Sequence, residues 1–229
     1  YQWEDGRGPG LWLALQQGPT LRGHAHQGHA GRRPGPQADP QGGVRQFAYD
    51  PVDNLVAESD PRGVATRYAY DLLDQLTEIQ GALGGTQQIR YDAVGNVTAM
   101  TDANGHTITL GYDAEDQLIE QKDATGNMTR YTYNDVGNLT ALTDALGRAT
   151  RYAYDAGDNL RTITDAPGNL TALEYDPEDN LLAITDANGH TTRFAYDPNG
   201  LLVAEMLPGG QTTRYEYDAV QNLVKYSNA

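Results

Sequence analysis

The sequence predicts an all-β fold built from antiparallel β-hairpin repeats of 21 residues. Nine tyrosines stand at a constant interval of 21 residues, and eight of them are followed by Asp. Each interval holds two runs that favour strands, separated by Asp-, Gly- and Asn-rich segments that favour short turns. Short turns make successive strands antiparallel, so we expect a ribbon of hairpins that twists and curves into a β-strip. The repeating tyrosines are Tyr49, Tyr70, Tyr91, Tyr112, Tyr133, Tyr154, Tyr175, Tyr196 and Tyr217.

A glycine is the second fixed feature of the repeat. With the Tyr as position one, position fifteen is Gly in all eight complete copies. Glycine between two strands predicts a turn residue with positive φ. We expect these glycines and the repeating tyrosines to have structural roles in the repeat. The glycines are Gly63, Gly84, Gly105, Gly126, Gly147, Gly168, Gly189 and Gly210.

Alternation within the second strand of each unit predicts its two faces. Thr150, Tyr152 and Tyr154 are two residues apart, so their side chains are expected on one face of the ribbon. Arg151 and Ala153 are expected on the other face. Position seven is aliphatic in every copy and position twenty is large and apolar or aromatic. The sequence therefore predicts one apolar, Tyr-rich face and one Arg-bearing face.

Residues 1–45 do not carry the repeat and are predicted to be a largely irregular, low-complexity segment. The segment is rich in Gly, Pro, Gln, His and Arg and lacks periodic apolar residues. It fits either a natural disordered linker or a stretch of altered reading frame, and the abrupt stop and restart of the repeat favours the second. His24, His26 and His29 could bind a transition metal there, but as an adventitious site. Residues 46–229 are predicted to form eight complete repeats and a truncated ninth.

Composition excludes several classes of function. The formal net charge of −15 argues against nucleic acid and anionic membranes as partners. The absence of cysteine excludes disulfides and thiolate zinc sites. No apolar run approaches the roughly 20 residues of a membrane-spanning helix. The chain starts at Tyr1 without Met and stops inside a repeat, so we expect a fragment of a longer protein.

The repeat resembles the RHS repeat, which is also called the YD repeat after its Tyr-Asp pair. YDAVGNVTAMTDANGHT at 91–107, YNDVGNLTALTDALGRATRYAYD at 133–155 and YDPEDNLLAITDANGHTTRFAYD at 175–197 follow the family pattern YDxxGNLxxxTDxxGxxTRYxYD. The family includes bacterial polymorphic toxins, toxin-complex subunits, wall-associated proteins and teneurins. Two copies depart from the pattern, at GALGG (81–85) and at MLPGG (206–210), where looser turns are expected.

The resemblance implies a segment of a hollow shell made by a spiralling β-strip. In toxin members the shell encloses a C-terminal toxic domain, so the implied partners are further repeats and a toxin or effector domain of the parent protein. The implied location is outside the bacterial cell or on its surface. The alternative hypothesis is adhesion, in which exposed Tyr and Arg side chains bind cell-surface glycans. Sequence beyond Ala229 would separate the two hypotheses.

The acidic turns do not predict a catalytic or metal site. Asp102 and Asn104 are followed at once by Gly105, which leaves one ligand too few for a calcium loop. The segment at 197–201, DPNGL, resembles a self-cleaving element of RHS toxins but lies in register as an ordinary turn. His106 and His190 flank turns, and isolated serines do not complete a nucleophilic triad. We therefore expect no enzyme activity, no cofactor and no metal.

Two further expectations concern architecture and solubility. Two units, 42 residues, have the length of one four-stranded propeller blade, which makes a propeller the rival to the strip. Residues 46–229 alone are expected to be marginally stable or self-associating, because repeat arrays with uncapped strand edges associate.

Overall fold

The computed structural model describes residues 36–38 and 43–228, and it shows nineteen strands and no helix in that part of the chain. Contacts divide the chain into two units, residues 1–128 and 129–229. The first unit contains β1 to β9. Their bounds are Gln37–Ala38, Val44–Tyr49, Leu55–Ser59, Ala65–Tyr70, Leu76–Gln80, Thr86–Tyr91, Val97–Thr101, Thr107–Tyr112 and Leu118–Lys122.

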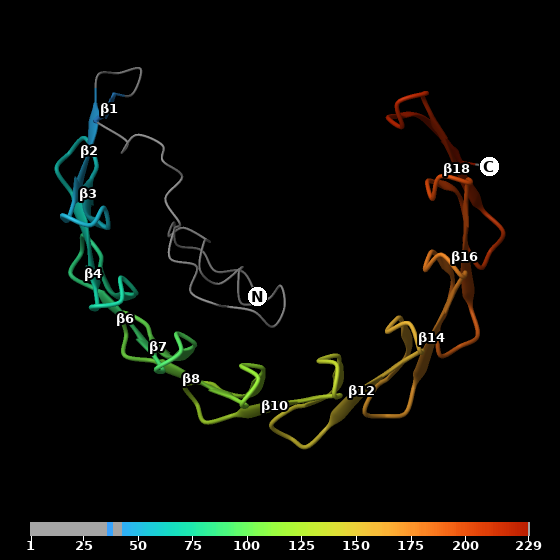
Figure 1. Ribbon diagram of the computed structural model, residues 1–229, viewed down its shortest axis with the longest axis horizontal. Coiled ribbons are helices and arrows are strands. Elements are labelled where there is room, and N and C mark those ends of the chain that lie inside the picture. Colours follow the sequence, from blue (N-terminus) through green and yellow to red (C-terminus); the bar gives the residue numbers. More distant parts are fainter. Residues whose placement is uncertain (1–35, 39–42, 229) are drawn as a thin grey trace. The chain divides into compact units, whose positions relative to one another are not determined.

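The second unit begins in β10 and continues to β19. The bounds of these strands are Met128–Tyr133, Leu139–Thr143, Ala149–Tyr154, Leu160–Thr164, Leu170–Tyr175, Leu181–Thr185, Thr191–Tyr196, Leu202–Met206, Thr212–Tyr217 and Leu223–Asn228. Within each unit every strand pairs antiparallel with the next in the chain, so consecutive hairpins follow one another in sequence order (Figure 1). The all-β hairpin prediction is confirmed. A propeller of four-stranded blades is wrong, because pairing continues unbroken through the eight strands from β2 to β9.

The described turns from β2 to β19 share one backbone form. In the turn after Tyr154, Asp158 N–H donates to the Asp155 carbonyl at 3.2 Å and Asp155 N–H donates to the Asn159 carbonyl at 2.9 Å. This is a type I turn followed by a residue with positive φ, which in hairpins forms a bulge and matches the strand twist. All eight position-fifteen glycines have positive φ.

The two departing turns keep this form. Gly84 N–H donates to the Gly81 carbonyl at 2.9 Å, and Gly210 N–H donates to the Leu207 carbonyl at 2.9 Å. The expectation of looser backbone turns there is therefore wrong. These turns lack the Asp side chain, so what they lose is its hydrogen bonds, while the backbone geometry is retained.

A β-bulge recurs once in each copy and decides which side chains share a face. Tyr152 lies opposite Ile163 and Tyr154 lies opposite Leu160, with a register shift between Ala153 and Tyr154. Leu160 and Ile163 are three residues apart, and in a regular strand they would point to opposite faces. The bulge places one extra residue, Arg161, in the strand and brings both apolar side chains to the face of the repeating tyrosines.

We call this surface the Tyr face. It carries positions eighteen, twenty and one of the second strand and positions seven and ten of the first. The predicted alternation is confirmed, because Thr150, Tyr152 and Tyr154 are half-buried while Arg151 and Ala153 are exposed.

The Tyr face is covered sparsely. Among the described residues, the buried hydrophobic side chains of this face are Ile89, Val97 and Leu110, and none of the large side chains is less than 2% exposed. Ala99 and Ala183 are also buried, but they lie opposite Arg90 and Arg193 on the other face. Ile89, Val97 and Leu110 form the core cluster of the first unit, with half-buried Leu76, Tyr91, Met100, Ile108, Tyr112 and Leu118 around it. Within each unit the described strands thus form a single layer whose apolar face is half-covered by its own side chains.

Candidate functional site

Most turns begin with an Asp, whose carboxylate caps the turn. Asp144 Oδ1 accepts hydrogen bonds from Leu146 N–H and Arg148 N–H, both at 2.9 Å, and its Oδ2 pairs with the Arg148 guanidinium. Two backbone donors on one carboxylate oxygen favour the ionised form. Accordingly, the hydrogen bond from the Arg148 side chain, followed by the one from the Arg148 backbone, lowers the pKa of Asp144. The acidic turns are therefore filled with their own hydrogen bonds.

The same bonding occupies the calcium-like turns. Asp102 Oδ1 accepts from Asn104 N–H at 2.8 Å and from His106 N–H at 2.9 Å, while Oδ2 lies 3.0 Å from His106 Nδ1. The hydrogen bond from the His106 side chain lowers the pKa of Asp102. Three or more His, Cys, Asp or Glu side chains do not gather in a metal-binding arrangement anywhere in the described part of the chain.

The DPNGL segment is an ordinary turn. Asp197 N–H donates to the Leu201 carbonyl at 2.9 Å, and Gly200 N–H donates to the Asp197 carbonyl at 3.0 Å. Asp197 Oδ1 caps the turn in the usual way, accepting from Asn199 N–H and Leu201 N–H. Trp3, Trp12 and the three histidines of the N-terminal segment lie outside the described residues.

Equivalent turns of neighbouring copies are joined by a hydrogen bond from a side-chain amide to a carboxylate. The Asn at position six donates its Nδ2–H to the Asp at position five of the next copy, 20 residues later, as in the 2.9 Å bond from Asn138 to Asp158. Asp158 has a φ of 65°, a conformation that Gly adopts more easily. An Asp at this position adopts a less favourable backbone conformation than Gly would, but its carboxylate accepts a charge-assisted hydrogen bond from the preceding repeat. The same bridges join Asn54 to Asp74, Asn96 to Asp116, and Asn159 to Asp179.

The residue type at position six of one copy varies together with the residue type at position five of the next copy. Where position six is the longer Gln, at Gln75 and Gln117, position five of the next copy is Gly, at Gly95 and Gly137. A Cβ on Gly95 would lie 3.9 Å from Gln75 Oε1, an ordinary van der Waals distance, so the positive φ of 97° rather than lack of space favours Gly here. Asn180 breaks the rule, because Gly200 follows it. These bridges were not predicted from the sequence, although the pairing of residue types 20 positions apart could have indicated them.

The repeating tyrosines donate a hydrogen bond as well as packing. Tyr154 Oη–H donates to the Leu139 carbonyl at 2.8 Å. The backbone ladder between β11 and β12 ends at Ala141 opposite Arg151, so the Leu139 carbonyl lies beyond its last pair. The hydroxyl therefore satisfies a backbone acceptor that the ladder leaves unpaired. Five more tyrosines make the equivalent bond, namely Tyr70, Tyr91, Tyr112, Tyr196 and Tyr217.

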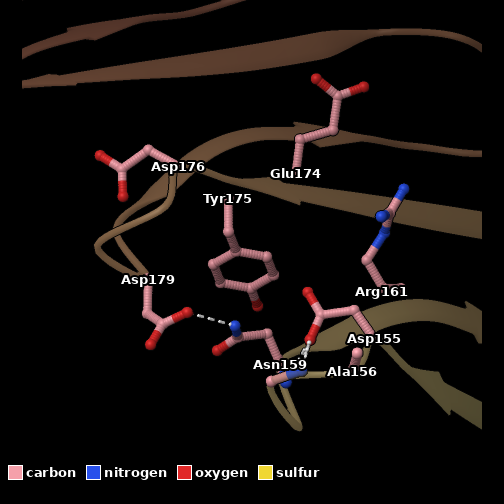
Figure 2. A pocket seen from close by; sticks show the side chains of 9 residues that line it. Asp155, Ala156, Asn159, Arg161, Glu174, Tyr175, Asp176 and Asp179 are labelled. Atoms are coloured by element: carbon pink, nitrogen blue, oxygen red, sulfur yellow. Dashed lines mark hydrogen bonds between the residues drawn. The ribbon is translucent and has the colours of Figure 1, made fainter.

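An open cleft of about 500 Å³ lies between the equivalent turns of two neighbouring copies in the second unit. Figure 2 shows the Tyr175 ring in its middle, with Arg161 and Glu174 to one side and Asp179 to the other. Asp179 already accepts the Asn159 amide at 2.6 Å, and Asp155 caps its own turn.

A third acidic side chain of this cleft serves its own turn. Asp176 also lines it, and the hydrogen bond from the Asn180 side chain lowers the pKa of that carboxyl. A carboxyl of lowered pKa stays ionised at neutral pH and is a poor general acid. The cleft is the gap between two equivalent turns of neighbouring copies. Glycan binding in such a gap stays a prediction.

Family models match nearly all of the repeat region. The RHS Repeat model matches residues 49–86 and 91–128, and the Teneurin YD-shell model matches residues 123–229. The chain belongs to the RHS/YD-repeat family. Shell repeats of this family are structural elements, in agreement with an arrangement in which the acidic side chains serve the turns.

Solved structures with a similar chain include toxin-complex proteins. The crystal structure of TcdB2-TccC3 is 16% identical, with a TM-score of 0.48, and the match covers 84% of this chain and 14% of that chain. The Tc holotoxin pore of Photorhabdus luminescens is 18% identical, with a TM-score of 0.38, covering 81% of this chain and 14% of that chain. This RHS/YD chain thus spans about one seventh of the length of these structures. No curated protein matches it in a sequence comparison. In the described residues no helix of a length and apolarity suited to crossing a membrane occurs.

Proposed function

We propose that the repeats form part of the wall of a hollow shell in a longer, secreted or surface-exposed bacterial protein. This shell encloses a C-terminal toxin or effector domain and keeps it apart from the producing cell. The observation that carries the proposal is the half-covered Tyr face. A sheet with one apolar face is stable when a second layer covers that face, and the described residues provide a single layer.

A spiralling ribbon supplies the missing layer from itself. In a closed shell, other turns of the ribbon or the enclosed domain lie against the apolar face. The recurring bulge and the Tyr154-type hydrogen bond keep that face continuous from copy to copy. Each hydrogen bond from Asn to Asp also links one copy to the next. Such contacts between neighbouring repeats are a main source of stability in repeat proteins. These features favour a wall over a site for chemistry.

The proposal is tested on the full-length parent protein by electron microscopy and limited proteolysis. We expect a closed, hollow particle whose wall is a β-ribbon, and a C-terminal domain that resists protease while the particle is intact. A parent shortened by residues 46–229 should expose that domain to cleavage. An open fibre, a bladed disc, or equal protease sensitivity with and without the repeats would refute the proposal.

A further inference from the structure

Two glutamates interrupt the apolar row of the Tyr face. Glu58 in β3 and Glu205 in β17 both occupy position ten, where the complete copies between them carry Ile, Met, Leu or Gln. Glu58 lies opposite Phe47 on one side and Thr66 on the other. Directly opposed residues of antiparallel strands have their side chains on the same face. Each carboxylate is therefore on the Tyr face and half-buried.

The second site repeats the first residue for residue. Glu205 lies opposite Phe194 and Thr213, which are the counterparts of Phe47 and Thr66. These are the two phenylalanines of the chain, and each stands beside one of the two glutamates. Phe, Glu and Thr thus occupy the same three places in both sets.

A tyrosine hydroxyl completes each set. Tyr68 Oη–H donates to Glu58 Oε1 at 2.9 Å, and Tyr215 Oη–H donates to Glu205 Oε2 at 3.3 Å. Burial and, next, the hydrogen bond to Glu58 raise the pKa of Tyr68 to about 12, so this hydroxyl keeps its proton at neutral pH. Each glutamate therefore has a Phe opposite it on one side and accepts one hydrogen bond from a Tyr hydroxyl.

The described residues provide no cation for these carboxylates. Lys and Arg side chains of the described residues form ion pairs with other carboxylates, for example those of Asp60, Asp144 and Glu216. The Arg side chains of the second strands, such as Arg67 and Arg214, are exposed on the opposite face. A negative charge beneath a second layer is costly unless that layer brings a positive one.

We propose that each Phe–Glu–Tyr set, Phe47–Glu58–Tyr68 and Phe194–Glu205–Tyr215, is a docking site for a cationic side chain of the polypeptide that covers the Tyr face. The carboxylate binds the ammonium or guanidinium group, and the two rings stack on it, as rings do in cation–π contacts. The proposal rests on the proposed function in that it takes the Tyr face to be covered by polypeptide. It adds what the covering segment must carry, which is Lys or Arg at two matched places.

The test uses the 229-residue chain and a tri-arginine peptide with blocked ends, followed by NMR at 0.15 M salt. We expect two sites per chain, with shifts at the rings of the two sets, and no binding of the uncharged tri-citrulline peptide. Glu58→Gln with Glu205→Gln should weaken binding about tenfold, because it removes the charge and retains the shape. Each single variant should leave one site.

A matched control removes the same amount of charge elsewhere. Glu115 and Glu178 are exposed at turn tips, so Glu115→Gln with Glu178→Gln keeps the same net charge as the first double variant. We expect this control to change binding less than about twofold. Circular dichroism of each variant checks that the strands remain.

Equal weakening in the two double variants would show general attraction to an acidic protein and would overturn the docking sites. Undiminished binding to the Glu58→Gln, Glu205→Gln variant would overturn them as well. Neither result would touch the shell proposal, which does not require these charges. Conversely, an open particle in electron microscopy would remove the shell while the two peptide sites on the isolated chain could still be measured.

Discussion

Replacing Tyr154 by Phe isolates the contribution of a repeating tyrosine's hydroxyl. The change retains the ring on the Tyr face and removes the 2.8 Å hydrogen bond to the Leu139 carbonyl. That carbonyl lies beyond the last backbone pair of β11 and β12, so no ladder bond replaces the lost donor. A hydrogen bond of this kind contributes about 1 kcal/mol, and an unpaired, half-buried acceptor costs a similar amount.

Tyr152→Phe is the matched control. Tyr152 lies on the same strand and the same face, two residues earlier, and its ring is likewise half-buried. Its hydroxyl makes no hydrogen bond to another described residue, so we expect the change to be within about 0.5 kcal/mol of neutral. The comparison separates the hydrogen bond from the removal of a hydroxyl as such.

Urea unfolding followed by circular dichroism measures the difference. With a slope of about 2 kcal/mol/M, a loss of 1 kcal/mol lowers the midpoint by about 0.5 M. Copies lie about 10 Å apart along the ribbon, a distance at which effects usually add. Removing the six hydroxyls named above should therefore cost about 6 kcal/mol, close to the whole stability of many domains. Equal midpoints for Tyr154→Phe and Tyr152→Phe would refute the reasoning.

Three other predictions concern the turns. Asp158→Gly should destabilise the chain relative to Asp158→Asn by about 0.5–1.5 kcal/mol in urea unfolding, because Asn retains an acceptor for the Asn138 amide; equal midpoints would contradict the bridge. Gly147→Ala should cost about 1–2 kcal/mol, since its φ is 77° and no neighbouring atom lies within 4 Å of a new Cβ, so the penalty comes from the backbone alone. Gly111→Ala, which has no positive φ, is its control and should be neutral in the same assay. Hydrogen bonds from the side chains of Thr125 and Arg148 lower the pKa values of two turn carboxyls, that of Asp123 to about 2 and that of Asp144 below its ordinary value, so their contribution is full above the ordinary value of 3.8 and is lost as pH falls toward 2; a melting temperature unchanged between pH 5 and pH 2.5 would contradict this.

The sequence by itself determined the repeat, the strands and the turns of this protein. A period of 21 residues with Asp and Gly at fixed places leaves little freedom, because Gly supplies positive φ and Asp caps its own turn. The faces of the second strand also followed from alternation, as Tyr152 and Arg151 show. These features depend on neighbours in the chain, which a single copy of the repeat already contains.

The tertiary structure alone decided which side chains meet across strands. Alternation alone would place Leu160 and Ile163 on opposite faces of the sheet. The bulge at Arg161 places them on the same face, and this bulge exists only because β13 pairs with β12 in a shifted register. The Asn138–Asp158 bridge, the Tyr154 hydroxyl bond and the Phe–Glu–Tyr sets likewise join residues 10 or more positions apart. Such contacts depend on strand register, and register is fixed only when one copy packs against the next.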